Sequence, residues 1–210
     1  MTLKTTPIPT RNWKITKDPV SERDLKRKES KQRVDRRIYY LWFHFLKLCL
    51  ELESIGHIFE KRVGGGKVIL GEGKLVKVNR DEYVGWDLDN LMSMKFNEWY
   101  YGDNKRDLFH KGDFEYSGRP QYHSLVKKFN VFIEYMNAKT GDYDKDMDLC
   151  EKIIKEYQKE RFERLQRTDY KSGKRLKRGE QELDYTRIIK RDIKDGEKII
   201  LSVCEGRFPK

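Results

Sequence analysis

Hydrophobic positions between residues 38 and 59 recur at intervals of three and four, which is the spacing of one face of an α-helix. A second apolar stripe runs beside the first. One stripe alone is typical of a coiled coil, whereas two stripes indicate a helix that packs against neighbours on two sides. The pattern predicts one long helix over residues 22–62. The first stripe comprises Ile38, Leu41, Phe45, Leu48, Leu52, Ile55 and Phe59, and the second comprises Tyr39, Trp42, Leu46 and Cys49.

The most apolar stretch of the chain, YYLWFHFLKLCLELE at residues 39–53, lies inside this predicted helix. Its apolar part, residues 39–50, is interrupted by His44 and Lys47. A membrane-spanning helix needs about 20 mostly apolar residues, so we expect this shorter stretch in a soluble core. The beginning of the chain, MTLKTTPIPTRNWK, lacks the apolar region of a signal peptide. We therefore expect a cytoplasmic protein with no membrane partner.

The glycine-rich stretch VGGGKVILGEGKLVKVN, residues 63–79, breaks the helical pattern. Two short β-branched runs within it flank the sequence Gly-Glu-Gly, which predicts a small β-hairpin near residues 67–78. Apolar periodicity then returns and predicts further helices. These begin near Asp87 or Asp89, near residue 122, near Asp144 and near Glu180, and the last one ends near Glu205.

The expected fold is mainly α, with five to six helices around the long N-terminal helix as a spine. Residues 1–20 contain three of the five prolines and show no periodicity, so we expect them to form an N-terminal arm. Residues 21–210 are expected to form a single α-rich domain. Within this domain, the glycine-flanked segment 171–179 is expected to be a basic linker.

The charge balance suggests the kind of partner. The chain carries 46 Lys and Arg against 35 Asp and Glu, a net charge of +11. Such an excess favours a polyanion such as nucleic acid, or else it merely solubilises the surface. The three cysteines stand far apart and no Cys/His cluster occurs, so neither a metal site nor a cofactor is expected.

Basic residues are most concentrated between residues 161 and 178, where eight of them stand against Glu163 and Asp169. Residues 22–37 form a secondary basic segment. Arginine can bind phosphate through two parallel hydrogen bonds, so the main segment is predicted to contact a nucleic-acid backbone. The predicted contact residues, which include two arginines of the last helix, are Arg161, Arg164, Arg167, Lys171, Lys174, Arg175, Lys177, Arg178, Arg187 and Arg191.

These observations predict a non-enzymatic nucleic-acid-binding protein. We expect it to contact phosphates largely without sequence specificity, because the sequence contains no recognised base-reading motif. DNA is favoured over RNA as the partner. A simpler interpretation is a solvated helix face on which acids and bases form i,i+4 pairs. That interpretation suits residues 151–164, where the charges mix, better than residues 171–178, where no acid offsets the bases.

Two other functions stay open. A protein-binding accessory or anti-defence factor would occupy an acidic or nucleic-acid-binding surface of a partner. It would hold that partner with aromatic surface residues such as Trp86, Tyr100 and Tyr101. A metal-dependent nuclease would use the pair Glu72 and Lys74, with the glutamate holding Mg²⁺ and the lysine polarising the attack. No second acidic ligand stands on an adjoining predicted strand, so no catalytic or metal-binding residue is assigned.

Two further motifs fail in their spacing. GGGK, residues 64–67, is followed by valine where a phosphate-binding P-loop needs Ser or Thr. DYDKDMD, residues 142–148, has the acid spacing of an EF-hand, but Met147 and Ile153 stand where glycine and glutamate are required. We expect these acids at the start of a helix, where they interact favourably with the helix dipole.

Three stretches together resemble the uncharacterised basic proteins encoded by bacterial phages, plasmids and other mobile elements. They are YYLWFHFLK, FNEWYYGDNKRDLF and YTRIIKRDIKDGEKIILSVCEGRFP, and the shared features are aromatic helices and a final helix that closes with Gly-x-Phe-Pro. The resemblance covers about a quarter of the chain and is structural rather than catalytic. It implies a setting in the biology of mobile DNA and implies no active-site residue.

Overall fold

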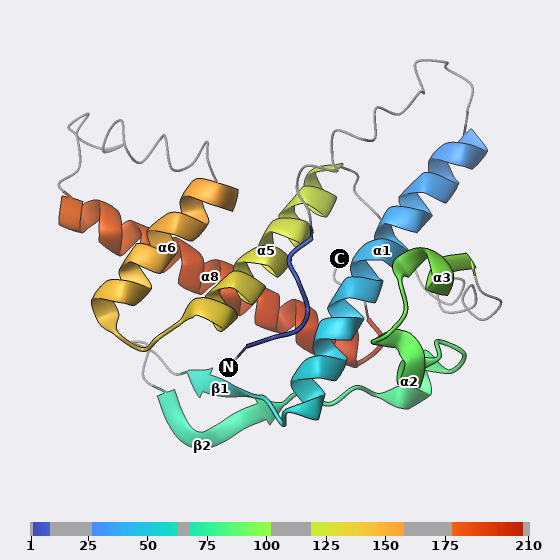
Figure 1. Ribbon diagram of the computed structural model, residues 1–210, viewed down its shortest axis with the longest axis horizontal. Coiled ribbons are helices and arrows are strands. Elements are labelled where there is room, and N and C mark those ends of the chain that lie inside the picture. Colours follow the sequence, from blue (N-terminus) through green and yellow to red (C-terminus); the bar gives the residue numbers. More distant parts are fainter. Residues whose placement is uncertain (1, 9–26, 63–67, 102–118, 158–177, 208–210) are drawn as a thin grey trace. The chain divides into compact units, whose positions relative to one another are not determined.

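The computed structural model describes residues 2–8, 27–62, 68–101, 119–157 and 178–207 (Figure 1). The described part is mainly helical with one small antiparallel sheet, which confirms the predicted fold class at this level. Its helices are α1 (Arg27–Ser54), α2 (Leu88–Leu91), α3 (Phe96–Tyr101), α5 (Arg119–Ala138), α6 (Tyr143–Tyr157) and α8 (Arg178–Cys204), with a 3-10 turn η3 (Arg80–Tyr83). Its strands are β1 (Ile58–Arg62) and β2 (Val68–Leu75).

The chain divides into two compact units. The first unit comprises Met1–Ile8 and Val126–Gly196, and the second unit comprises Pro9–Leu125 and Glu197–Lys210. Helices α5 and α8 therefore each contribute residues to both units. Of the predicted N-terminal arm, the structure describes residues 2–8, which belong to the first unit. The single domain and the role of α1 as its spine stay predictions.

Helix α1 ends at Ser54, short of its predicted end. Gly56 has a φ of +63°, and its amide donates to the carbonyl of Glu53 over 2.9 Å. The amide of His57 donates to the carbonyl of Leu52, also over 2.9 Å. This pair of hydrogen bonds is a Schellman motif, in which a left-handed glycine ends a helix and satisfies its last carbonyls.

The predicted continuation of this helix to residue 62 is therefore wrong, because residues 58–62 form β1. Strand alternation replaces the helical pattern here: Phe59 is buried, while Ile58 and Glu60 are exposed. Ile55, predicted as part of the apolar stripe, is 51% exposed and lies outside the core. The predicted start of the helix, residues 22–26, lies outside the described residues.

The predicted hairpin is present as a two-stranded antiparallel sheet, but its strands differ from those predicted. β2 pairs with β1, which comes from residues predicted to be helical. Ile58 pairs with Leu75 and Glu60 pairs with Gly73, and the register then shifts between Glu60 and Lys61. The Gly-Glu-Gly sequence that was predicted to turn lies inside β2 at this irregularity. The residues that join the two strands, 63–67, lie outside the described part.

Aromatic side chains from α1, η3 and α3 build much of the core of the second unit. Trp86 and Trp99 are both fully buried, with ring centroids 4.6 Å apart. Trp42 donates from Nε1 to the Tyr83 hydroxyl over 2.8 Å, and that hydroxyl donates to the carbonyl of Val203 in α8. Burial raises the pKa of Tyr83, so its hydroxyl keeps the proton that it donates. The ring nitrogen of Trp42 and the hydroxyl of Tyr83 thus have hydrogen-bond partners within the core.

The stretch 39–53 lies in α1 and forms part of this core, as predicted. Leu41, Leu48 and Leu52 are each 0% exposed. Within the described ranges, every helix is too short or too polar to cross a membrane.

The helix predicted to run from Asp87 or Asp89 through residue 99 is instead two short helices, α2 and α3. Lys47 of α1 donates to the carbonyls of Met92 and Met94 between them, over 3.1 and 2.6 Å. A cation at these carbonyls stabilises the end of α2, because helix C-termini carry partial negative charge. A tertiary contact thus stabilises the interruption between the two helices.

Helices α5, α6 and α8 occur close to their predicted bounds. At the start of α6, Asp142 accepts a hydrogen bond from the amide of Lys145. Asp146 accepts from the amides of Thr140 and Gly141. Desolvation raises the pKa of Asp146, but these hydrogen bonds outweigh it and hold the pKa below its usual value. The acidic cluster therefore stabilises the turn that precedes α6 and the first turn of the helix.

Replacing Gly56 by alanine is expected to lower the free energy of unfolding by about 1–2 kcal/mol, the cost of a left-handed conformation for an L-residue. No atom lies within 4 Å of the added methyl group, so the effect is conformational rather than steric. Gly56→Asn is expected to cost less, because asparagine tolerates this conformation. Urea denaturation of the three proteins measures the difference. An alanine variant as stable as its parent would show that Gly56 does not end α1 in this way.

Candidate nucleic-acid interface

The structure describes three of the ten predicted contact residues. Arg187 and Arg191 are exposed side chains on α8, and Arg178 is the first residue of that helix, described here by its backbone only. The remaining seven, Arg161, Arg164, Arg167, Lys171, Lys174, Arg175 and Lys177, lie outside the described residues.

Helix α8 is amphipathic. Its apolar face is buried, so its opposite face is exposed to solvent. In the first unit, the buried apolar side chains of this helix are spaced by three and four residues. They are Tyr185, Ile188, Ile189 and Ile193. Burial of this face leaves the opposite face of the helix for charged side chains.

Four basic side chains occupy this opposite face. Arg187, Lys190, Arg191 and Lys194 are all exposed and stand at positions i, i+3, i+4 and i+7, so they form one strip along the helix. We call these four residues the α8 basic stripe. With a rise of 1.5 Å per residue, the stripe is about 10 Å long. The predicted contact residues include the two arginines of the stripe but not Lys190 and Lys194, although the spacing of these lysines from Arg187 was a usable signal.

Two acidic residues of α8 near the stripe, Asp192 and Asp195, pair with lysines of α5. Asp192, whose side chain is only 3% exposed, lies 3.5 Å from the ammonium group of Lys127. Asp195 lies 3.2 Å from the ammonium group of Lys128. These two pairs use carboxylates that could otherwise neutralise the stripe. No ion pair joins Arg191 to another residue in the described part of the chain.

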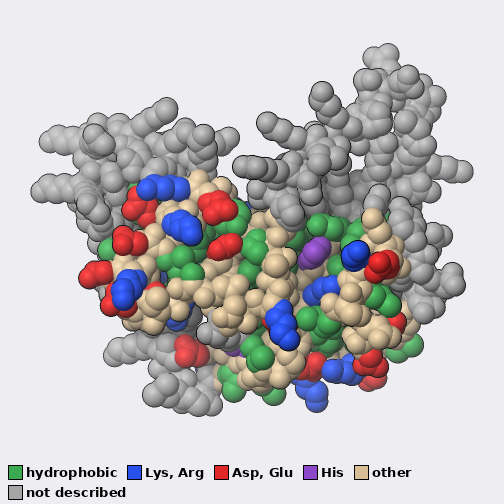
Figure 2. Space-filling view, viewed as in Figure 1, with side chains coloured by type: hydrophobic (Ala, Val, Ile, Leu, Met, Phe, Trp, Pro, Cys, Tyr) green, Lys and Arg blue, Asp and Glu red, His purple; other side chains and the backbone are tan. Residues whose placement is uncertain are grey.

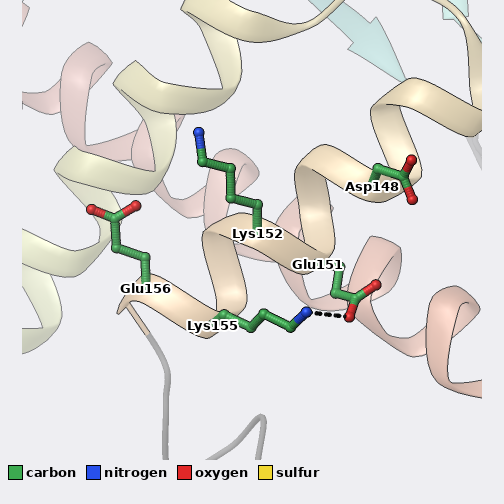
Figure 3. A pocket seen from close by; sticks show the side chains of 5 residues that line it. All are labelled: Asp148, Glu151, Lys152, Lys155 and Glu156. Carbon is green, nitrogen blue, oxygen red and sulfur yellow. Dashed lines mark ion pairs between the residues drawn. The ribbon is translucent and has the colours of Figure 1, made fainter.

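The outer face of α6 differs from the stripe in the arrangement of its charges. Acidic and basic side chains are interspersed there (Figure 2). A shallow pocket on this face is lined by Asp148, Glu151, Lys152, Lys155 and Glu156 (Figure 3). Lys155 pairs with Glu151 over 2.7 Å as an i,i+4 ion pair. For the described residues 151–157, this mixed face fits the solvated helix that the sequence predicted.

The described residues hold no cluster of metal-ligating side chains, since they contain no group of three or more His, Cys, Asp or Glu side chains that could hold a metal ion. Cys150 is buried beside α8, and burial raises the pKa of its thiol to about 11, so it is protonated and a poor nucleophile near neutral pH. Burial also lowers the pKa of His44 to about 4, with a further contribution from the charge of Lys47.

The structure describes some of the residues predicted for the two alternative functions, protein binding and metal-dependent cleavage. Trp86, expected as a surface anchor for a protein partner, is 1% exposed and belongs to the core. Tyr100 is half-buried against Phe96, with ring centroids 5.2 Å apart. Lys74 lies 4.0 Å from a carboxylate oxygen of Glu205. The side chains of Glu72 and Tyr101 lie outside the described part, so the nuclease hypothesis stays untested.

Comparisons with protein-family models, with curated proteins and with solved structures found no match for this chain.

The low pKa of His44 predicts how stability depends on pH. An unfolded histidine binds a proton near pH 6.5, whereas folded His44 binds one only near pH 4. Between these values the unfolded state holds more protons, so the free energy of unfolding falls as the pH drops from 6.5 towards 4. The slope from this group is at most about 1.4 kcal/mol per pH unit.

His44→Phe is expected to flatten this dependence, because the variant lacks the titrating group. Urea denaturation of parent and variant at several pH values between 4 and 7 measures both slopes. Equal slopes in the two proteins would contradict the assignment.

Proposed function

We propose that this chain is a cytoplasmic, non-enzymatic nucleic-acid-binding protein that contacts phosphates largely without sequence specificity. The observation that supports the proposal most directly is the α8 basic stripe, whose nearby acids pair with lysines of α5. The proposed setting among phages, plasmids and other mobile elements depends on the sequence resemblance alone.

The stripe has the geometry that phosphate binding needs. Its four cations stand on a single helix whose opposite face is buried, so their backbone positions are fixed before a ligand binds. The guanidinium groups of Arg187 and Arg191 can each donate two parallel hydrogen bonds to a phosphate. Lys190 and Lys194 add a positive charge between the arginines and one beyond them. Backbone contacts of this kind give affinity and orientation without reading the bases.

A basic segment of the sequence precedes the stripe. Residues 171–178 carry five basic residues and no acid, and Glu180, Glu182 and Asp184 stand between them and Arg187. The segment and the stripe are thus two basic regions, each of which could hold a polyanion. We propose DNA over RNA as the partner.

A second candidate function is protein binding through the hairpin. Ile58 and Leu75 are cross-strand partners, and they are 52% and 51% exposed. Neighbouring apolar side chains left this exposed on a sheet are typical of interaction surfaces. With Trp86 buried, this pair replaces it as the expected anchor of an accessory or anti-defence factor.

The stripe is tested by neutralising it. In the variant Lys190→Gln, Arg191→Gln, Lys194→Gln, binding to duplexes of any sequence is expected to weaken alike. Each lost phosphate contact lowers the slope of log K against log salt by about 0.9 on B-DNA, so three contacts lower it by about 2.7. The matched control is Lys95→Gln, Lys145→Gln, Lys152→Gln, which removes the same charge from exposed positions elsewhere.

Titration of labelled duplex at several salt concentrations gives the slopes of the parent and both variants. A control that loses as much slope as the stripe variant would show a diffuse charge effect and no site on α8. A parent that fails to bind nucleic acid at physiological salt would overturn the function and favour the protein partner. Metal-dependent cleavage of the duplex by the parent would favour the nuclease.

A further inference from the structure

The N-terminal residues 2–8 lie along helix α5 within the first unit (Figure 1). Leu3 is 5% exposed and Ile8 is 3% exposed, whereas Thr2, Lys4 and Thr6 between and before them are exposed. Two apolar side chains therefore anchor an otherwise polar segment in the fold.

Two asparagines of α5 bind the backbone of this segment. The Asn130 side chain accepts from the amide of Ile8 over 2.7 Å and donates to the carbonyl of the same residue over 2.8 Å. Asn137, two helical turns further on, accepts from the amide of Leu3 over 2.6 Å. Asn130 thus satisfies both backbone groups of Ile8, as a neighbouring β-strand would.

The sequence around Ile8 explains why it suits such a site. It stands between Pro7 and Pro9, and a residue that precedes proline is held in an extended conformation. Neither proline has an amide hydrogen, so Ile8 supplies the sole backbone donor of the three. Asn130 recognises the one residue in this stretch that can both donate and accept.

Removal of the N-terminal segment from this site would be energetically unfavourable. Asn130 is 0% exposed, and its amide group would lose both hydrogen bonds if the segment left. A buried polar group without a partner is unfavourable, so the site favours occupancy by any segment that restores these bonds. The arrangement resembles a peptide-binding site. The bound segment is extended and buries two apolar side chains, and a buried asparagine of the site forms hydrogen bonds with its backbone.

We propose that this face of α5 is a binding site for the N-terminal segment in trans as well as in cis, so that two copies of the chain can exchange their segments 2–8. The ligand is an extended stretch with a proline-flanked apolar residue and a second apolar residue five positions before it. A second copy carries this ligand by construction. The 18 residues from 9 to 26 separate the segment from α1, and such a length can span at most about 60 Å.

Two variants separate the ligand from its site. Ile8→Asp keeps the asparagines of the site but gives a segment that cannot bind there, because the aspartate charge would be buried without a partner. Asn130→Ala combined with Asn137→Ala keeps the segment but removes all three hydrogen bonds. Circular dichroism confirms that each is folded. If the double variant does not fold, Asn137→Ala alone replaces it, since Asn137 is only half-buried.

Analytical ultracentrifugation then compares each variant alone with their equimolar mixture. The mixture contains one intact segment and one intact site, and it is expected to form a 1:1 complex at least tenfold more tightly than either variant self-associates. Folded variants that associate no better in the mixture than alone would overturn the exchange.

A labelled peptide of residues 1–12 tests whether the site binds the segment when it is not covalently joined to the rest of the chain. It is expected to bind Ile8→Asp protein at least tenfold more tightly than the same peptide carrying Ile8→Asp. It should bind the parent more weakly than the Ile8→Asp protein, because the parent's own segment competes at high effective concentration. Failure of the peptide to bind the folded Ile8→Asp protein would overturn the site itself. Neither result depends on nucleic-acid binding.

Discussion

The buried carboxylate of Asp192 is the constraint on which the proposed interface depends. A carboxylate this deeply buried is unfavourable unless a cation and further polar groups compensate it. Lys127 supplies the cation from α5 and so allows Asp192 to be buried with the apolar face of α8. The apolar side chains around Ile189 turn inward on the same face, and the basic stripe is left on the opposite face. The orientation of the proposed binding surface thus follows from the burial of an apolar face whose one buried carboxylate is paired.

Helix α5 supplies polar partners to two other segments of the first unit. Its lysines neutralise acids of α8, and its asparagines satisfy the backbone of the N-terminal segment. In both cases a polar group from a distant part of the chain must meet a partner on α5, because a buried polar group without one is costly. Apolar patterning makes these elements amphipathic, and the polar pairs then select one arrangement within the first unit.

Local patterns in the sequence predicted the long helices well, because burial of one face imposes a period of 3.6 residues on each. The end of α1 was missed because Ile55 and Phe59 continue that period by chance, while Gly56 sets the actual stop. Lys190 and Lys194 follow the helical spacing of Arg187 and Arg191, which the sequence shows. The pairing of Asp192 and Asp195 with lysines of α5 is a tertiary effect that the sequence does not show. The partnership of Ile8 with Asn130 spans 122 positions, and no local pattern encodes it.

Lysine footprinting tests the central claim most directly. Brief acetylation of the protein, with and without duplex DNA, followed by mass spectrometry, reports which ammonium groups the nucleic acid covers. If duplex binds along the α8 basic stripe, Lys190 and Lys194 lose reactivity when duplex is present, whereas the exposed Lys95 and Lys145 keep theirs. Unchanged reactivity at Lys190 and Lys194 in a bound complex would contradict the assignment of the interface to α8.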